Sequence, residues 1–268
     1  MKRIIARLLV LSAVLCLFSL LSPSDGFAQS KTAAESKKSP QADKTLSSKS
    51  APVVSVAPKS ASNSALSYLS PLEREILEEM NLARTNPQQY AAYVEQFKTY
   101  YNGNRLKLPG RQTPIVTFDG IAAVDEAIGF LKAARPQTAL EVNRGMSLAA
   151  KDHANDLALK GVSGHKGSDG STPNARLERY GRWDGVVGEN IVYDVSTARE
   201  IVIGLIIDDG TANRGHRRNI FDPNHRVAGI SVMDSPANGA KCVLDYAGGF
   251  ADKAGIEPSK SAPATRKL

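Results

Sequence analysis

The chain has 268 residues, with 34 Lys and Arg, 27 Asp and Glu, and a formal net charge of +7 at pH 7. The excess of positive charge lies at the ends of the chain. Residues 1–69 hold 9 basic and 3 acidic side chains, whereas residues 70–250 hold 21 basic and 22 acidic ones. A folded region so close to neutral lacks the basic surface that specific nucleic-acid binding requires, so this class of function is disfavoured.

The first 28 residues have the pattern of an export signal. Three basic side chains precede an apolar run at 8–21, and small residues follow up to Ala28. This run is too short for a membrane-spanning helix, which needs about 20 residues. We therefore predict an exported protein, cleaved after Ala28 and located outside the cell, in the periplasm or in the cell envelope.

Cysteine usage excludes a disulfide-stapled fold. Cleavage of the signal removes Cys16 and leaves Cys242 as the single thiol, and one cysteine cannot form an internal disulfide. Because Cys242 begins an apolar run with Val243 and Leu244, we predict a core residue of a strand.

Two segments are predicted to be disordered, a tether at 29–69 and a C-terminal tail at 251–268. The tether consists mainly of Ser, Ala, Lys and Pro, and such a composition buries too little apolar surface to offset the entropy lost on ordering. Its positive charge predicts nonspecific, salt-sensitive contact with anionic polymers of the cell envelope.

Residues 70–250 are long enough for one folded domain. Ser70, with Pro71 and Glu73 behind it, is a typical helix start, and Pro87 restarts the chain as a second helix. An extended segment is predicted at 115–118, followed by a helix capped by Asp119.

The second half combines helices with a sheet. Ser147 is expected to cap a helix that ends at Gly161, residues 173–180 form a short helix, and Ser196 or Thr197 caps another. Extended segments are predicted at 191–193, 227–233 and 241–246, and the last two are joined as a hairpin through residues 236–239. Helices that cover a small antiparallel sheet make the fold class α+β.

The four histidines lie between His153 and His225, and two of them are candidate site residues. His165 follows a helix stop, and His216 lies in the segment R-G-H-R-R-N-I. Glu189, in G-E-N-I, precedes an apolar strand, where a carboxylate needs a cation or hydrogen-bond donors. Each of the three can serve in a ligand site or as a structural clasp. We expect His153 to be a satisfied helix residue and His225 a turn residue.

Several blocks together resemble the CAP superfamily of cysteine-rich secretory, antigen-five and pathogenesis-related-one proteins, in its bacterial, disulfide-free branch. The resemblance covers about residues 70–250 and implies an α-β-α sandwich with a central cleft. The blocks are Asn81-x-x-Arg84-x-x-Pro87-x-x-Tyr90, His165, G-E-N-I at 188–191, G-H-R-R-N-I at 215–220 and Gly229-Ile230.

The resemblance also implies a divalent-metal site of two histidines and two acidic residues. His165 and His216 match the histidines, and Glu189 matches the first acid. The family's second acid is a glutamate near a tryptophan, and residues 204–210 contain neither. Asp208 or Asp209 is the candidate replacement, and zinc is the expected metal.

Two functions remain open. The first is an exported binding module whose cleft holds a metal, a lipid or a peptide. The second is a metal-assisted extracellular hydrolase in which Glu189 is the catalytic base. No obvious nucleophile or oxyanion device accompanies these residues, so the binding module is favoured.

Overall fold

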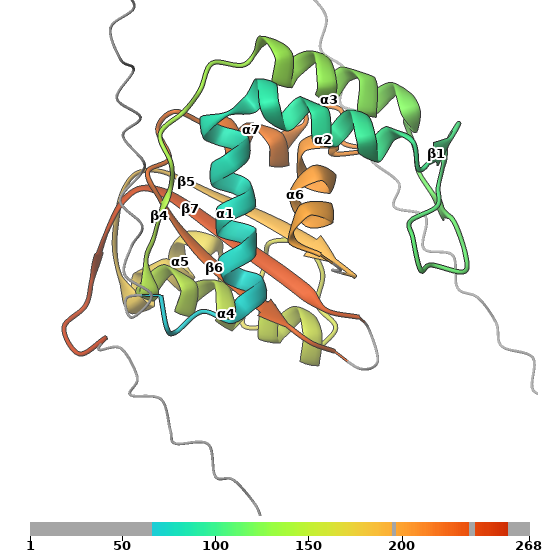
Figure 1. Ribbon diagram of the computed structural model, residues 1–268. Helices are drawn as coiled ribbons and strands as arrows, with labels where there is room; N and C mark the ends of the chain where they lie inside the picture. Colours follow the sequence, from blue (N-terminus) through green and yellow to red (C-terminus); the bar gives the residue numbers. More distant parts are fainter. Residues whose placement is uncertain (1–65, 195–196, 236–238, 257–268) are drawn as a thin grey trace, which may run out of the picture. The chain divides into compact units, whose positions relative to one another are not determined.

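The computed structural model describes residues 66–194, 197–235 and 239–256 (Figure 1). The helices are α1 (Pro71–Thr85), α2 (Pro87–Lys98), α3 (Ile121–Ala133), α4 (Arg144–Leu159), α5 (Pro173–Tyr180), α6 (Ala198–Ile207) and α7 (Gly215–Phe221). The strands are β1 (Tyr101–Asn102), β2 (Arg105–Leu106), β3 (Ile115–Val116), β4 (Glu141–Val142), β5 (Gly181–Tyr193), β6 (Val227–Met233) and β7 (Lys241–Asp252).

The main sheet has the strand order β4-β6-β7-β5. The short strand β4 pairs with β6 in parallel, and the other two pairings are antiparallel. The long strand β5 therefore lies at one edge of the sheet. Strands β1, β2 and β3 form a separate small antiparallel sheet.

The central strand β7 shows why helices cover both faces of the main sheet. Successive side chains of a strand point to opposite faces. Leu244 and Tyr246 belong to a core cluster with residues of α1, α2, α3 and α6, whereas Val243 packs with α4 and Ala247 with α4 and α5. Both faces are thus buried, which gives an α-β-α sandwich and confirms the predicted α+β class (Figure 1).

Helix starts follow the predicted capping chemistry in two places and differ from it in two. Ser70 and Thr197 each form a capping box with the glutamate three residues later. The predicted cap at Ser147 is wrong, because α4 begins earlier and Asn143 is its N-cap. Asp119 does not cap α3 either, because Gly120 occupies that position and Asp119 accepts a hydrogen bond from Gly210.

The motif residues Asn81 and Arg84 tie α1 to distant loops. The Asn81 side chain makes hydrogen bonds to both the backbone N–H and the carbonyl of Leu140, which precedes β4. The fully buried guanidinium of Arg84 donates to four carbonyls, of which one lies in the last turn of α7 and two in the loop between α7 and β6. These contacts hold α7 and its flanking loop in place. The four acceptors are Thr138, Ile220, Asp222 and His225.

The ordered domain extends slightly beyond the predicted 70–250. Leu69 is buried, and the ring of Tyr68 lies against the guanidinium of Arg144. At the other end, β7 continues to Asp252, which pairs with Gly181. Ladder pairing and these side-chain contacts order residues whose composition alone did not indicate a fold.

Some of the predicted segments fall outside the described residues. They are the signal at 1–28, most of the tether, the tail after residue 256 and most of the hairpin turn at 236–239. Among the described residues, no helix is both long and apolar enough to cross a membrane.

Gly229 tests how closely α4 approaches β6. A Cβ atom at this position would lie 2.2 Å from the carbonyl carbon of Met146, a backbone atom that cannot move aside cheaply. We expect Gly229→Ala to lower the free energy of unfolding by about 1–3 kcal/mol through overpacking. Urea denaturation measures this change, and an unchanged midpoint would contradict the close approach.

Candidate functional site

The first half of the site joins His165, Glu189 and Arg176. Nδ1 of His165 lies 2.8 Å from Oε1 of Glu189, and Nη2 of Arg176 lies 2.5 Å from Oε2 of the same carboxylate. The side chains of Arg176 and Glu189 are each only 1% exposed, whereas that of His165 is 56% exposed. A buried ion pair thus holds an imidazole at the surface.

Local sequence explains how these side chains meet. Thr172 caps α5 and Pro173 starts it, so that Arg176 lies in its first turn. Arg176 also donates to the carbonyls of His165 and Ser171, which closes the loop between α4 and α5. Glu189 thus has a guanidinium and an imidazole as its partners, which supply the cation and the hydrogen-bond donor that a buried carboxylate needs.

A second acid lies beside Glu189 that was not predicted from the sequence. Asp245 on β7 is the direct partner of Glu189 in the β5–β7 ladder, and it is fully buried. Burial and the neighbouring carboxylate of Glu189 raise the pKa of Asp245 well above its usual range. The sequence pattern that could have revealed Asp245 is an aspartate inside an otherwise apolar strand, because charged residues are almost never fully buried unless they are paired.

The second half of the site joins His216 and Asp208. Nδ1 of His216 lies 2.7 Å from Oδ1 of Asp208, whose Oδ2 accepts the backbone N–H of His216 at 2.8 Å. Burial raises the pKa of Asp208, but the hydrogen bonds and electrostatic attraction of His216, together with a hydrogen bond from Thr211, lower it by more, so that the net shift is downward. Asp208 is buried, whereas the side chain of His216 is 30% exposed.

Asp208 and Asp209 are adjacent in the sequence, but their carboxylates contact different parts of the structure. Asp208 ends α6 in the left-handed conformation, with φ 51°, which aspartate tolerates better than most residues. Asp209 then accepts the backbone N–H groups of Phe118, Asp119 and Gly120. Of the two predicted replacements, the structure places only Asp208 against a histidine.

Asn190 connects the two halves. Its Nδ2 donates to the carbonyl of His216 and to the hydroxyl of Tyr246, and its Oδ1 accepts from Asn219. Asn219 also donates to the carbonyl of Glu189. Both asparagines belong to motif blocks, and the structure gives them the role of holding α7 against the edge strand β5.

The other two histidines are buried. Nε2 of His153 lies 2.8 Å from the carbonyl of Gly164, whereas its Nδ1 is buried and has no hydrogen-bond partner among the described residues, so the predicted helix histidine is only partly satisfied. His225 follows a turn, stacks on Tyr246 and makes a hydrogen bond through Nδ1 to the carbonyl of Asn219. Burial lowers the pKa of both imidazoles.

The atoms of the site that could coordinate a metal are imidazole nitrogens, because the carboxylate oxygens are engaged by the histidines and Arg176. Each exposed histidine uses Nδ1 on a buried carboxylate, which is the arrangement of histidines that bind metals through the other ring nitrogen. Within the described ranges, no three His, Cys, Asp or Glu side chains gather as a possible metal site. A cavity of about 360 Å³ lies elsewhere, because none of His165, Glu189, Asp208 and His216 lines it.

A family described as "CAP: Cysteine-rich secretory protein family" matches residues 77–246, which is more than half of the chain. The chain belongs to the CAP family. This match includes every residue of both His–carboxylate pairs. A search of curated proteins gives no match.

Three solved structures are similar to this CAP protein at low identity. One, an outer surface protein of Borrelia burgdorferi, is 17% identical with a TM-score of 0.35, covering 42% of this chain and 78% of that one. An extracellular protein containing an SCP domain from Bacillus anthracis is 18% identical with a TM-score of 0.35. A cysteine-rich secretory protein from Staphylococcus aureus is 15% identical with a TM-score of 0.30. Each of the latter two alignments covers 48% of this chain and 38% of the other.

The buried ion pair predicts a large loss of stability when one partner is removed. Arg176→Met leaves the Glu189 carboxylate buried beside a single imidazole, and we expect the free energy of unfolding to fall by about 3–5 kcal/mol. The double variant Arg176→Met/Glu189→Gln removes both charges and should lose less than the single variant. Chemical denaturation of the wild type and the variants measures the coupling.

A matched control comes from the surface of the same helix. Arg179 pairs with Asp152 and Asp169, and its side chain is 40% exposed. Arg179→Met should therefore cost no more than about 1 kcal/mol. Equal losses for Arg176→Met and Arg179→Met would contradict a buried pair.

Histidine titration should separate His165 from the buried imidazoles. The hydrogen bond to Glu189 raises the pKa of His165 above 6.5, whereas burial lowers those of His153 and His225 below it. NMR of the imidazole C–H groups in EDTA should show His165 protonating before His153 and His225 as pH falls. A pKa of His165 below that of His153 would refute this order.

The same shifts fix the direction of the stability change with pH. His165 stabilises the fold below pH 6.5, and this contribution is lost as pH rises through its raised pKa. His153 and His225 are neutral in the folded state, so their contribution is present above pH 6.5 and is lost as pH falls through their lowered pKa values. The buried imidazoles thus make the fold less stable as pH falls below 6.5, whereas His165 and the raised pKa of Asp245 act in the opposite direction. Urea denaturation at pH 7.5 and pH 5.5 should therefore show a smaller loss of stability on acidification in His153→Gln than in the wild type.

Proposed function

We propose that this CAP protein is an exported binding module in which the exposed edges of His165 and His216 contact the ligand. Export is supported by the signal-like pattern of residues 1–28 and by membership of a family described as secretory. The observation that carries the proposal is the shared geometry of the two histidines. Each has Nδ1 fixed by a buried carboxylate, and the ring of His165 is exposed whereas that of His216 is half-buried.

Zinc is the metal that this donor chemistry supports, since imidazole suits zinc better than calcium or magnesium. We infer that His165 and His216 bind the ion, whereas Glu189 and Asp208 fix the orientation of the two rings through Nδ1. When bound, the ion would supply a positive charge and open coordination positions for water or a partner's donor group. Two protein ligands imply weak binding that a partner or ligand completes.

Binding is better supported than hydrolysis because of the state of Glu189. A general base must come within hydrogen-bond reach of the proton that it abstracts. Both carboxylate oxygens of Glu189 already have partners, and its side chain is 1% exposed. A hydrolase would also need to release this carboxylate from Arg176.

Thermal melting in EDTA and then in added zinc, calcium or magnesium tests the metal. Saturating zinc should raise the melting temperature by a few degrees, because a domain of this size gains about 2–4 °C for each kcal/mol of binding free energy. Calcium and magnesium should produce a smaller rise or none. The double variant His165→Gln/His216→Gln should lose the response to zinc.

Asp169→Asn is the matched control, because Asp169 is an exposed carboxylate that contacts Arg179 and neither histidine. This variant should keep the full response to zinc. An equal rise in the double histidine variant would show that zinc binds elsewhere and would overturn the metal assignment. The binding module would then depend on other ligands at the same surface.

A further inference from the structure

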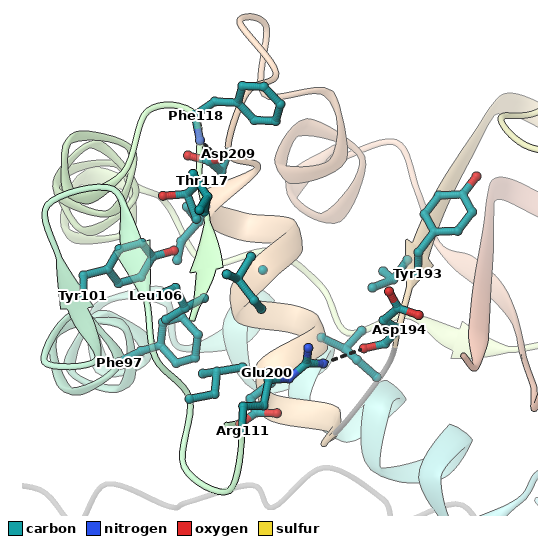
Figure 2. A pocket seen from close by; sticks show the side chains of 17 residues that line it. Phe97, Tyr101, Leu106, Arg111, Thr117, Phe118, Tyr193, Asp194, Glu200 and Asp209 are labelled. Carbon is teal, nitrogen blue, oxygen red and sulfur yellow. Dashed lines mark hydrogen bonds between the residues drawn. The ribbon is translucent and has the colours of Figure 1, made fainter. Parts of the chain in front are cut away.

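A second concave site lies between the small β1–β3 sheet, α6 and the end of β5. The cavity has a volume of about 360 Å³ and is lined mainly by apolar and aromatic side chains, within the size range of small-ligand sites. Figure 2 shows Phe97 and Leu106 on one side and Tyr193 on the other. Its lining also includes two of the most exposed large apolar side chains of the described residues, Val116 at 67% and Phe118 at 87%.

The α6 side of the cavity contains a glycine, Gly204, at a position where the backbone conformation does not require glycine. Gly204 lies within α6, and its φ is not in the left-handed region. A Cβ atom at this position would meet no atom within 4 Å. Glycine inside a helix is destabilising relative to alanine, so neither conformation nor close packing explains it. Its effect is to leave space between Ile201 and Ile207, which line the same cavity.

Of the charged side chains that line the cavity, Arg111 is the one that can bind an anionic ligand, because the three carboxylates have other contacts. Asp209 accepts three backbone N–H groups, Glu200 belongs to the capping box of α6, and Asp194 faces Lys241 at 3.8 Å. Among the described residues, Arg111 has no carboxylate within ion-pair distance. Its guanidinium makes one long hydrogen bond of 3.4 Å to the carbonyl of Asp194, which lies across the cavity (Figure 2).

We propose that this cavity binds an apolar carboxylate, with the apolar group over Gly204 and the carboxylate on Arg111. A guanidinium binds a carboxylate through two parallel hydrogen bonds, which outmatch the single long bond to the Asp194 carbonyl. The apolar lining accounts for the remainder of the ligand. Binding in this cavity does not require the histidine site, because the two sites share no residue.

Decanoate and decanol are the probes, measured by calorimetry on the protein in EDTA. The wild type should bind decanoate at least about tenfold more tightly than decanol, since a hydrogen bond to a charged group contributes that much. Arg111→Gln should reduce the affinity for decanoate to that for decanol. Equal binding of the two probes by the wild type would overturn the role of Arg111.

Two glycine variants test the position of the apolar group. Gly204→Leu should fill the cavity and abolish binding of both probes. Gly129 is an exposed helical glycine of α3 where an added Cβ atom would likewise meet no atom within 4 Å, and it does not line the cavity. Gly129→Leu should therefore bind both probes as the wild type does, and circular dichroism should show both variants folded. Unchanged binding by Gly204→Leu would overturn the assignment of the cavity.

A third experiment distinguishes a free alkyl carboxylate from the C-terminus of a peptide. An acetylated tripeptide that ends in leucine is compared with its C-terminal amide. Tighter binding of the acid than of decanoate, with loss of affinity in the amide, assigns the cavity to peptide C-termini. Binding of decanoate alone assigns it to free alkyl carboxylates. Failure of decanoate, decanol and the peptide acid to bind would overturn the proposal.

Discussion

The buried pair of Arg176 and Glu189 is the constraint on which the first half of the site depends. A guanidinium and a carboxylate that are both removed from water must neutralise one another, because each alone carries a desolvation penalty of several kcal/mol. This requirement holds α5 to the edge strand β5 and fixes the carboxylate. One oxygen then remains for His165. The imidazole is thus oriented by the interior of the protein although its ring is exposed.

Two other buried arginines position the second half. Arg84 reaches from α1 to carbonyls of α7 and of the loop between α7 and β6, and Arg217 reaches from α7 to the carbonyls of Ile206 and Ile207 and to Glu126. The planar guanidinium, with five donors, suits the bridging of several carbonyls. Because Arg217 follows His216 directly, the contact that anchors α7 to the end of α6 also sets the imidazole beside Asp208.

The helices that were predicted best are those whose first residue is set by a capping side chain close by in the sequence. The capping box at Ser70 appears as expected, and Thr197, one of the two caps predicted for α6, forms another, because a cap involves only a few neighbouring residues. The cap at Asn143 and the short helix α7 were missed, since weak local signals are decided by packing. The partners of Glu189 were missed for the same reason. Arg176 and Asp245 meet it only after α5 and β7 have packed against β5.

The two candidate sites use different sources of free energy. At the histidine site, buried carboxylates hold polar rings in one orientation, so that binding there requires little further ordering. At the cavity, an apolar surface is left without cover, and α6 carries Gly204 where alanine would be more stable. The helix α6 contributes to both sites, because Asp208 ends it beside His216 and Gly204 faces the small sheet. A change in the length of α6 would therefore displace the polar site, whereas a larger side chain at position 204 would close only the apolar one.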